Sequence, residues 1–343
     1  MDNNSLESVL EYFKSKNKKD KTEEESQELK EVVLNFKMGI IEKFKDKSCL
    51  KVFLDNICRF NKYSYFNQLL IFSQRPEVKY VSSFIDYKKM GYTVIHKDCG
   101  IKILTPIFTS FVKIKKEDGL YEEKPTFVLT DKEKEELQDK NNDDVIFSKR
   151  RLTGYKVGNV YDISDTTMDI NEIENQLNPI IDDERAIDYI KIFESIINSN
   201  NYTLRIEDIR GEVKGYCDNV NKNIVVSSNL TNLMKLKTII HEYAHSILHY
   251  EIDNKEYQEN RNKYETEAET IAYVISNYLG FDVSDYSSTY LYSWSENKDI
   301  SEIDKSLEII VKNSSAIITK LKDKVLELSN NKNLENDIEM EVA

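Results

Sequence analysis

Apolar residues recur at three- and four-residue spacing along most of the chain, a pattern typical of amphipathic helices. In the first hundred residues this spacing predicts helices over 5–16, 26–47, 63–74 and 81–91. Pro76 ends the third of these helices, because the residue before a proline is pushed out of helical space. Gly91 stops the fourth. The chain is therefore expected to begin as a group of helices.

The pattern then changes to short β-branched runs separated by the turn sequences "DCG" and "EDG". Such runs predict strands over 92–98, 101–108 and 111–116, with a closing strand over 155–164. Together they indicate a small antiparallel sheet. A charged insertion at 131–144 interrupts it, and we expect a solvated loop or helix there.

Seven acidic residues and no basic residue lie between Asp165 and Glu184, which indicates a linker. A strand over 202–208 and a hairpin over 215–228, turning at "DNVNKN", are expected after it. The last dozen residues are acidic and rich in Asn, so they are expected to be disordered. Apolar spacing predicts further helices over 186–199, around "HEYAH", over 265–280 and over about 299–329.

These elements predict a helix-rich α+β protein. A length of 343 residues is consistent with two domains. The expected organisation is an amino-terminal domain of helices and a small antiparallel sheet (1–163), an acidic linker (164–184), a second domain (185–329) and a disordered tail (330–343).

Several classes of protein are disfavoured by the sequence. No run approaches the roughly 18 apolar residues that cross a bilayer, so no membrane association is expected. The acidic, polar start "MDNNSLESVL" does not resemble a signal peptide. Four scattered cysteines without a CxxC pair argue against a cysteine zinc site and a disulfide framework. A reduced, cytoplasmic protein is expected.

Charge is distributed unevenly. The net charge of −13 disfavours a nucleic-acid partner. Residues 51–116 nevertheless carry twelve Lys or Arg against four acidic residues. In this segment Tyr and Phe alternate with basic residues and amides, a mixture that single-strand binders use because cations follow phosphates while aromatic rings stack on bases. Some of these aromatics, including Phe66 and Phe72, are expected in the core.

The sequence "HEYAH" at 241–245 offers two imidazoles one helical turn apart, the spacing of HExxH zinc sites. Glu242 lies beside them, where a carboxylate can act as general base on zinc-bound water. The pentapeptide also arises by chance on amphipathic helices, so a third ligand is needed. His249 is too distant on a straight helix, because the three positions span roughly 12 Å. It is expected to cap the helix or to support a ligand.

The next predicted helix offers three glutamates as the third ligand. Glu265 and Glu269 share a face, and Glu267 points away from it. If Glu265 is the ligand, Glu269 would not bind the metal itself and would instead orient one of the ligand histidines. Tyr286 and Tyr290 are candidates for stabilising an oxyanion, with surface aromatics as the alternative.

The run from "GYCDNVNKNIVVSSNL" through "HEYAHSILH" to "ETEAETIAYVISNYLG" resembles gluzincin metallopeptidases, specifically ImmA/IrrE-like proteins and the carboxy-terminal domain of ArdC antirestriction proteins. The resemblance implies a zincin domain that binds one Zn²⁺ through His241, His245 and Glu265, with Glu242 as general base. It also implies that the hairpin strand at 223–227 is an edge that aligns a peptide substrate.

The run "YSYFNQLLIFSQRP" resembles the amino-terminal single-stranded DNA-binding domain of ArdC proteins, which carries YS-x-x-N-x-x-L-I-x-x-Q-x-P. A short "I-x-I-L-x-P" strand and the run "VYDISDTT" fit the same domain. The residues expected to contact DNA are Arg59, Lys62, Tyr63, Tyr65, Asn67, Gln74, Arg75, Lys88, Lys89 and Lys97.

The sequence thus predicts a zinc metalloendopeptidase coupled to a single-stranded DNA-binding domain and associated with a mobile element. Its protein substrate would be a repressor or a restriction component. The alternative is a DNA-binding antirestriction protein that does not cleave, with a structural or vestigial zinc site.

Overall fold

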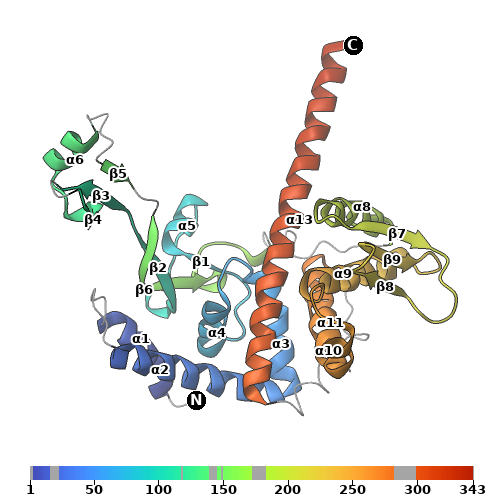
Figure 1. Ribbon diagram of the computed structural model, residues 1–343, viewed down its shortest axis with the longest axis horizontal. Helices are drawn as coiled ribbons and strands as arrows, with labels where there is room; N and C mark the ends of the chain where they lie inside the picture. Colours follow the sequence, from blue (N-terminus) through green and yellow to red (C-terminus); the bar gives the residue numbers. More distant parts are fainter. Residues whose placement is uncertain are drawn as a thin grey trace. The chain divides into compact units, whose positions relative to one another are not determined.

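The computed structural model describes residues 3–15, 23–116, 119–138, 145–147, 150–171, 183–281 and 299–342. These residues form a helix-rich α+β fold, as the sequence predicted, and their strands make three small sheets (Figure 1). Contacts divide the chain into two compact units. The first unit comprises Met1–Phe36 and Lys102–Asn159, and the second unit comprises Lys37–Ile101 and Val160–Ala343.

The first unit contains a three-stranded antiparallel sheet in which β3 lies between β4 and β5. The ring of Phe13 on α1 packs edge-on against Tyr155 on β6. The predicted strands over 101–108, 111–116 and 155–164 are present, and the charged insertion contains α6. The elements are α1 (Asn3–Ser15), most of α2 (Glu23–Ile41), most of β2 (Ile101–Thr109), β3 (Phe111–Lys115), β4 (Tyr121–Pro125), α6 (Asp131–Gln138), β5 (Val145–Phe147) and most of β6 (Arg151–Asp162).

The second unit opens with short helices that begin at side-chain caps. Asp46, Ser64 and Ser83 each accept a hydrogen bond from a backbone N–H of the first turn that follows. The strand β1 pairs with the last residues of β6. These helices and this strand are α3 (Lys47–Arg59), α4 (Tyr65–Gln74), β1 (Val81–Ser83) and α5 (Phe84–Lys89).

The strand predicted over 92–98 is wrong. Only Val94 forms a bridge, to Thr166, and residues 97–99 form a 3-10 turn. The backbone of this segment instead bonds to the loop after β6: Thr93 donates its N–H to the Thr167 hydroxyl, and Ile95 donates its N–H to the Asp165 carbonyl. Loop contacts therefore replace a regular ladder.

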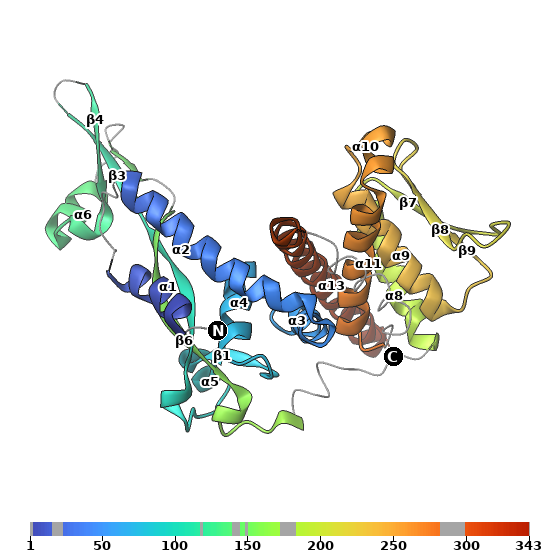
Figure 2. The ribbon, with the colours of Figure 1, turned by 90° about the horizontal axis from the view of Figure 1, so that it is seen from below.

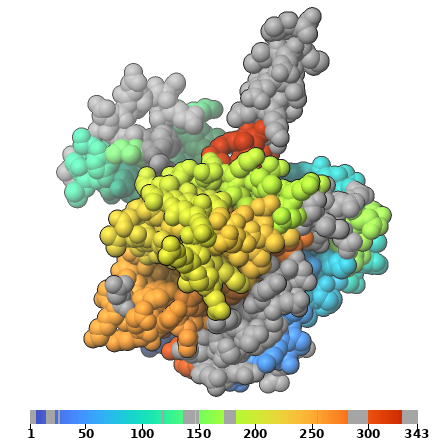
Figure 3. Space-filling model, turned by 90° about the vertical axis from the view of Figure 1, so that its right-hand side faces the viewer, coloured from blue at the N-terminus to red at the C-terminus, as the bar shows by residue number. Residues whose placement is uncertain are grey.

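The carboxy-terminal part of the second unit has a three-stranded sheet of order β7-β9-β8. β8 and β9 form the predicted hairpin, and β7 pairs with β9 in parallel. Figure 3 shows this side of the unit, with α8 and the sheet in yellow-green to yellow and the α10 region in orange. The elements are α8 (Asp183–Ser199), β7 (Thr203–Glu207), β8 (Gly215–Asp218), β9 (Asn223–Ser227), α9 (Asn232–Leu248), α10 (Asn254–Glu259), α11 (Arg261–Tyr278) and α13 (Ile300–Val342).

The expectation that Asn223–Ser227 is a sheet edge is wrong. β9 has a partner on each side, so its backbone groups are used within the sheet. β8 is the outer strand next to α9, with which it packs.

Helix α11 lies beside α9 and α13 (Figure 2) and packs against both of them and against α3, and α13 also contacts α4. Two acidic residues join the early helices to the late ones. Asp304 on α13 accepts a hydrogen bond from the Tyr65 hydroxyl and pairs with Lys37, whereas Asp55 on α3 accepts from Tyr273 on α11. The limits of the two compact units do not coincide with the domain boundaries expected at 163 and 185, and those boundaries stay a prediction.

The outcomes differ for two segments that the sequence predicted to be irregular, the linker and the tail. The linker over 164–184 lies largely outside the described residues, which omit 172–182. The disordered tail predicted over 330–343 differs from the structure, where α13 is helical to Val342. No Gly or Pro follows Gly280 in the chain, so the sequence contains no residue that breaks this helix. No helix in the described ranges is apolar enough over sufficient length to span a bilayer.

We predict that Gly215→Ala destabilises the fold by about 1–3 kcal/mol, because overpacking forces neighbours apart. A Cβ at this position on β8 would lie 2.7 Å from Thr238 Cγ2 and 2.9 Å from the Val225 carbonyl oxygen. Urea unfolding measures the change. In the matched control Gly39→Ala, the added Cβ in α2 meets nothing within 4 Å, and stability should rise by about 0.5–1 kcal/mol. Equal midpoints for Gly215→Ala and the wild type would contradict the prediction.

Candidate metal centre

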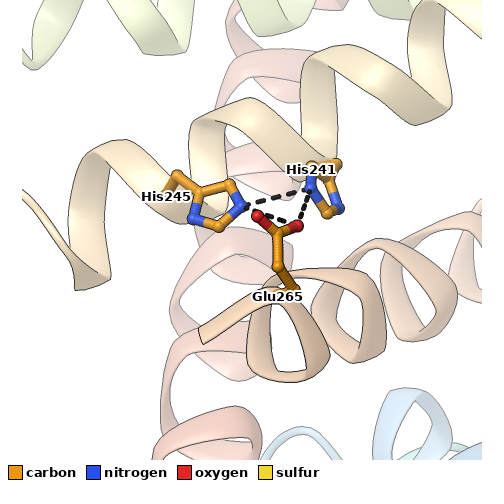
Figure 4. A group of neighbouring side chains, drawn as sticks. All are labelled: His241, His245 and Glu265. Atoms are coloured by element: carbon orange, nitrogen blue, oxygen red, sulfur yellow. Dashed lines mark hydrogen bonds and ion pairs between the residues drawn. The ribbon is translucent and has the colours of Figure 1, made fainter. Parts of the chain in front are cut away.

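The helix pair α9 and α11 brings together the three residues expected to bind metal. His241 and His245 lie one turn apart on α9, and Glu265 approaches both from α11 (Figure 4). The two imidazole Nε2 atoms are 3.1 Å apart, and Glu265 Oε2 lies 3.4 Å from the first and 3.7 Å from the second. Thr231 caps the start of α9 by accepting from the Met234 N–H, which fixes where the helix begins.

These three donors fit a divalent transition metal. One ligand atom from each residue lies within 4.8 Å of the others. Two imidazoles and a carboxylate form the donor set of catalytic zinc sites, which keep a fourth position open. The three side chains therefore form a candidate metal centre.

The ionisation of the cluster shows how strongly it holds positive charge. Burial opposes protonation of His241, yet hydrogen bonds with Glu265 and Glu269 raise its pKa to about 10. Burial likewise opposes ionisation of Glu265, but hydrogen bonds with the two histidines hold its pKa far below the usual range. The group thus has a strong preference for a cation at its centre.

Glu269 lies where the sequence placed it, beside a histidine and outside the triad. Its Oε2 is 3.2 Å from His241 Nδ1, and its Oε1 is 2.6 Å from the ammonium of Lys237. Although burial opposes ionisation, bonds to His241 and Lys237 lower the pKa of Glu269 to about 2. An ionised Glu269 can fix the orientation of the His241 ring.

Glu242 is buried beside the triad, and its exposed fraction is 8%. Burial raises the pKa of its carboxyl, an effect that the nearby His241 and His245 oppose. β8 passes close to it: a Cβ at Gly215 would lie 3.4 Å from Glu242 Cγ. A buried carboxylate with a raised pKa suits proton transfer near neutrality.

Three supporting residues were missed or only partly foreseen. The Tyr257 hydroxyl on α10 donates to Glu265 Oε1 at 2.9 Å, and no motif in the sequence indicates it. His249 caps the carboxy-terminal end of α9, which is one of the two roles expected for it, and its ring also contacts His245. Glu267 points away from the triad as expected, but it faces His249. Tyr286 and Tyr290 lie outside the described residues.

The structure separates the residues expected to contact DNA into three classes of exposure. Tyr65 and Asn67 have exposed fractions of 7% and 9%, so in this conformation their side chains pack in the core instead of facing a ligand. Arg75 is held by Asp165 at 2.7 Å. The exposed residues are Lys62, Lys88, Lys89 and Lys97, and the partly exposed ones are Arg59, Tyr63, Gln74 and Arg75.

Two of the exposed lysines lie over aromatic rings. Lys62 Nζ is 5.2 Å from the centre of the Tyr63 ring and 5.5 Å from that of Tyr80. Lys97 Nζ is 5.5 Å from the centre of the Phe84 ring, and the residue Phe84 is 41% exposed. Cations and accessible rings therefore occur together around α5.

Comparison with known proteins identifies one part of the chain. Residues 190–276 match the model of peptidase family M78, described as the IrrE N-terminal-like domain. This segment runs from within α8 to within α11 and contains the whole candidate triad. The candidate metal centre therefore lies in a segment that is similar to the IrrE N-terminal-like domain.

Longer similarities are weaker. An uncharacterised protein of Bacillus anthracis is 25% identical over 329 residues, which cover 90% of this chain and 53% of that protein. The chain thus spans about half the length of this relative. Two crystal structures of the antirestriction protein ArdC from plasmid R388 are similar to this chain. The metal-free one is 13% identical, with TM-score 0.39, over 77% of this chain and 86% of its own. The Mn(II)-bound one is 14% identical, with TM-score 0.38, over 76% and 84%.

We predict that one equivalent of Zn²⁺ raises the melting temperature of the wild-type protein, because a ligand that binds only the folded state stabilises it. At a free concentration of 100 times Kd the stabilisation is about 2.7 kcal/mol. Glu265→Ala should abolish the shift, whereas Glu259→Ala, on the exposed surface of α10, should retain it. Calorimetry with and without metal measures both. A full shift in Glu265→Ala would remove Glu265 from the ligand set.

Proposed function

We propose that the chain is a zinc-dependent metallopeptidase whose second unit also carries a surface for single-stranded DNA. The observation that carries the proposal is the convergence of His241, His245 and Glu265 beside the buried Glu242, inside a segment that matches a peptidase family. The chemistry of the donor set favours zinc among the common metals.

The residues of the site divide the work of peptide hydrolysis. His241, His245 and Glu265 would hold one Zn²⁺, which when bound lowers the pKa of water towards 7 and polarises a carbonyl. Glu242 would accept the proton of the attacking water and then pass it to the leaving amine. Glu269 and Lys237 hold the His241 ring, and Tyr257 holds the oxygen of Glu265 that faces away from the histidines.

β8 offers a place for the substrate backbone. Ser227 donates its N–H to the Lys214 carbonyl, and residues of an antiparallel pair alternate in direction. The backbone groups of Tyr216 and Asp218 therefore face β9, and those of Gly215 and Cys217 face the side where no strand of the described residues pairs with β8. An extended peptide can add to such an edge as a further strand. The sheet edge that was expected at β9 is therefore proposed at β8, which packs on α9.

We predict that Glu242→Gln lowers peptide cleavage by about 10²–10⁴-fold, the usual effect of a general base, while zinc still binds stoichiometrically. A pool of synthetic peptides, analysed by mass spectrometry after incubation with zinc-loaded protein, provides the measurement. Glu251→Gln, at an exposed position after α9, is the matched control and should cleave normally.

Undiminished cleavage by Glu242→Gln would contradict the assignment of Glu242 as the general base. A wild-type protein that binds zinc but cleaves none of these peptides would favour the alternative function, in which the chain binds DNA and the metal is structural. A protection assay with a restriction enzyme and Glu242→Gln then separates the two functions, since DNA protection without Glu242 needs no hydrolysis.

The DNA surface is proposed around α5, where Lys62 and Lys97 lie over the rings of Tyr63 and Phe84. Lys88 and Lys89 add exposed positive charge from α5 itself. Positive side chains can follow phosphates while accessible rings stack on unpaired bases. We further propose that the protein acts in the cytoplasm for a mobile element, on a repressor or a restriction component. The sequence resemblance to antirestriction proteins supports this role.

We predict that the triple variant Lys88→Ala, Lys89→Ala, Lys97→Ala binds a 30-nucleotide single strand more weakly. Each lost phosphate contact reduces the salt slope of log Kd by about 0.7, so three reduce it by about 2. Fluorescence anisotropy of the full chain at several salt concentrations measures the slope. A control that removes the same charge elsewhere is Lys191→Ala, Lys255→Ala, Lys312→Ala, at exposed positions on α8, α10 and α13. An equal loss in both variants would reject the surface at α5.

A further inference from the structure

A row of buried polar side chains leads from the candidate metal centre to α13. His245 Nδ1 lies 2.9 Å from His249 Nδ1, and His249 Nε2 lies 3.4 Å from Glu267 Oε2. Ser306 on α13 donates its hydroxyl to Glu267 Oε1 at 2.6 Å. Their exposed fractions are 6% for His245, 3% for His249, 2% for Glu267 and 0% for Ser306. Burial this complete means that each polar atom depends on its neighbour in the row.

The direction of the hydrogen bonds follows from the metal ligand. His245 turns its Nε2 towards the other two ligands, so this nitrogen is the one that would bind a metal. A neutral imidazole then carries its proton on Nδ1 and donates it to His249 Nδ1. His249 consequently carries its own proton on Nε2 and donates it to Glu267. A carboxylate only accepts, so the Ser306 hydroxyl must donate. One arrangement satisfies every atom.

We propose that His249, Glu267 and Ser306 are positioning residues of the metal centre, which fix the tautomer and the ring plane of His245. The inference rests on the proposed metal site and concerns residues that bind no metal themselves. Packing supports it, because the His249 ring lies 4.7 Å from the Tyr264 ring, measured between centres, and is held between neighbours. A clamped ring can transmit an orientation to the imidazole that it contacts.

The two histidine ligands are supported in different ways. His241 contacts the carboxylate of Glu269 directly, and the ammonium of Lys237 partly neutralises that carboxylate. His245 reaches the carboxylate of Glu267 only through His249, and the partners of Glu267 in this row are an imidazole and a hydroxyl. The negative charge of Glu267 therefore acts on His245 through one intervening ring. Three helices, α9, α11 and α13, together determine the position of this ligand.

The test measures metal affinity without any substrate. Glu267→Gln and Ser306→Ala are compared with the wild type by Zn²⁺ competition against a chromophoric chelator. Residues outside the metal that orient a ligand typically change affinity by about 10–100-fold, and we expect a loss in this range for Glu267→Gln and a smaller loss for Ser306→Ala. The visible absorption of Co²⁺-loaded protein should also shift, because it reports the geometry at the metal.

A matched control excludes a general effect on α13. Ser314 is as deeply buried as Ser306 on the same helix, but its hydroxyl has no hydrogen-bond partner among the described residues. Ser314→Ala should leave the Zn²⁺ affinity and the Co²⁺ spectrum unchanged. Melting of the metal-free variants shows whether each one folds. If Glu267→Gln does not fold, Ser306→Ala, which retains the buried carboxylate, decides the question.

The outcomes separate this inference from the proposed function. Wild-type affinity and an unchanged Co²⁺ spectrum in folded Ser306→Ala and Glu267→Gln would overturn the positioning role and leave the metal site intact. Equal losses in Ser306→Ala and Ser314→Ala would also overturn it. A wild-type protein that binds no Zn²⁺ would instead remove the metal site itself, and the inference with it.

Discussion

The structure depends on carboxylates at the interface of α9 and α11, where Glu267 is buried and Glu265 and Glu269 are partly buried. A buried charge is tolerated only when it is paired, and removing one partner of a buried pair typically costs about 3–5 kcal/mol. Each glutamate of α11 at this interface has partners, and together they fix how the two helices face one another. The pairs are Glu265 with both ligand histidines and Tyr257, Glu267 with His249 and Ser306, and Glu269 with His241 and Lys237.

The same helices connect the metal centre to the basic segment 51–116. α11 contacts α3 through the bond from Tyr273 to Asp55, and α13 contacts α4 through the bond from Tyr65 to Asp304. Asp304 lies two residues before Ser306, which supports the row of side chains behind His245. The proposed DNA surface and the proposed active site therefore belong to one compact unit, although the sequence separates them by more than 140 residues.

Local patterns made much of the fold predictable, and long-range contacts made the rest unpredictable. The helix around "HEYAH", its glutamate-bearing partner and the hairpin before them follow from spacing and turn residues within about twenty positions. The burial of Tyr65 depends on Asp304, 239 residues away, and no periodicity in α4 could indicate it. The sequence suggested that β9 is an edge because the hairpin pattern includes only β8 and β9. The second partner of β9 is the parallel strand β7, which comes before the hairpin in the chain. Likewise, Tyr257 carries no motif, and its role depends on where α10 lies.

The charge of the cluster explains why the site suits a divalent ion. Four glutamates lie in the cluster or next to it: Glu265 within the triad, Glu242 beside it, Glu269 against His241, and Glu267 behind His249. Among the residues that the structure describes, the basic groups ion-paired to them are the ammonium of Lys237 and the largely exposed guanidinium of Arg261, which lies 3.9 Å from Glu265. With neutral histidines these groups sum to −2, and one divalent cation brings the sum to zero. Without an ion, protonation of His241 is the nearest substitute, and it supplies half the charge. Because charge buried in a low-dielectric interior is costly, the arrangement favours a doubly charged ion over a proton.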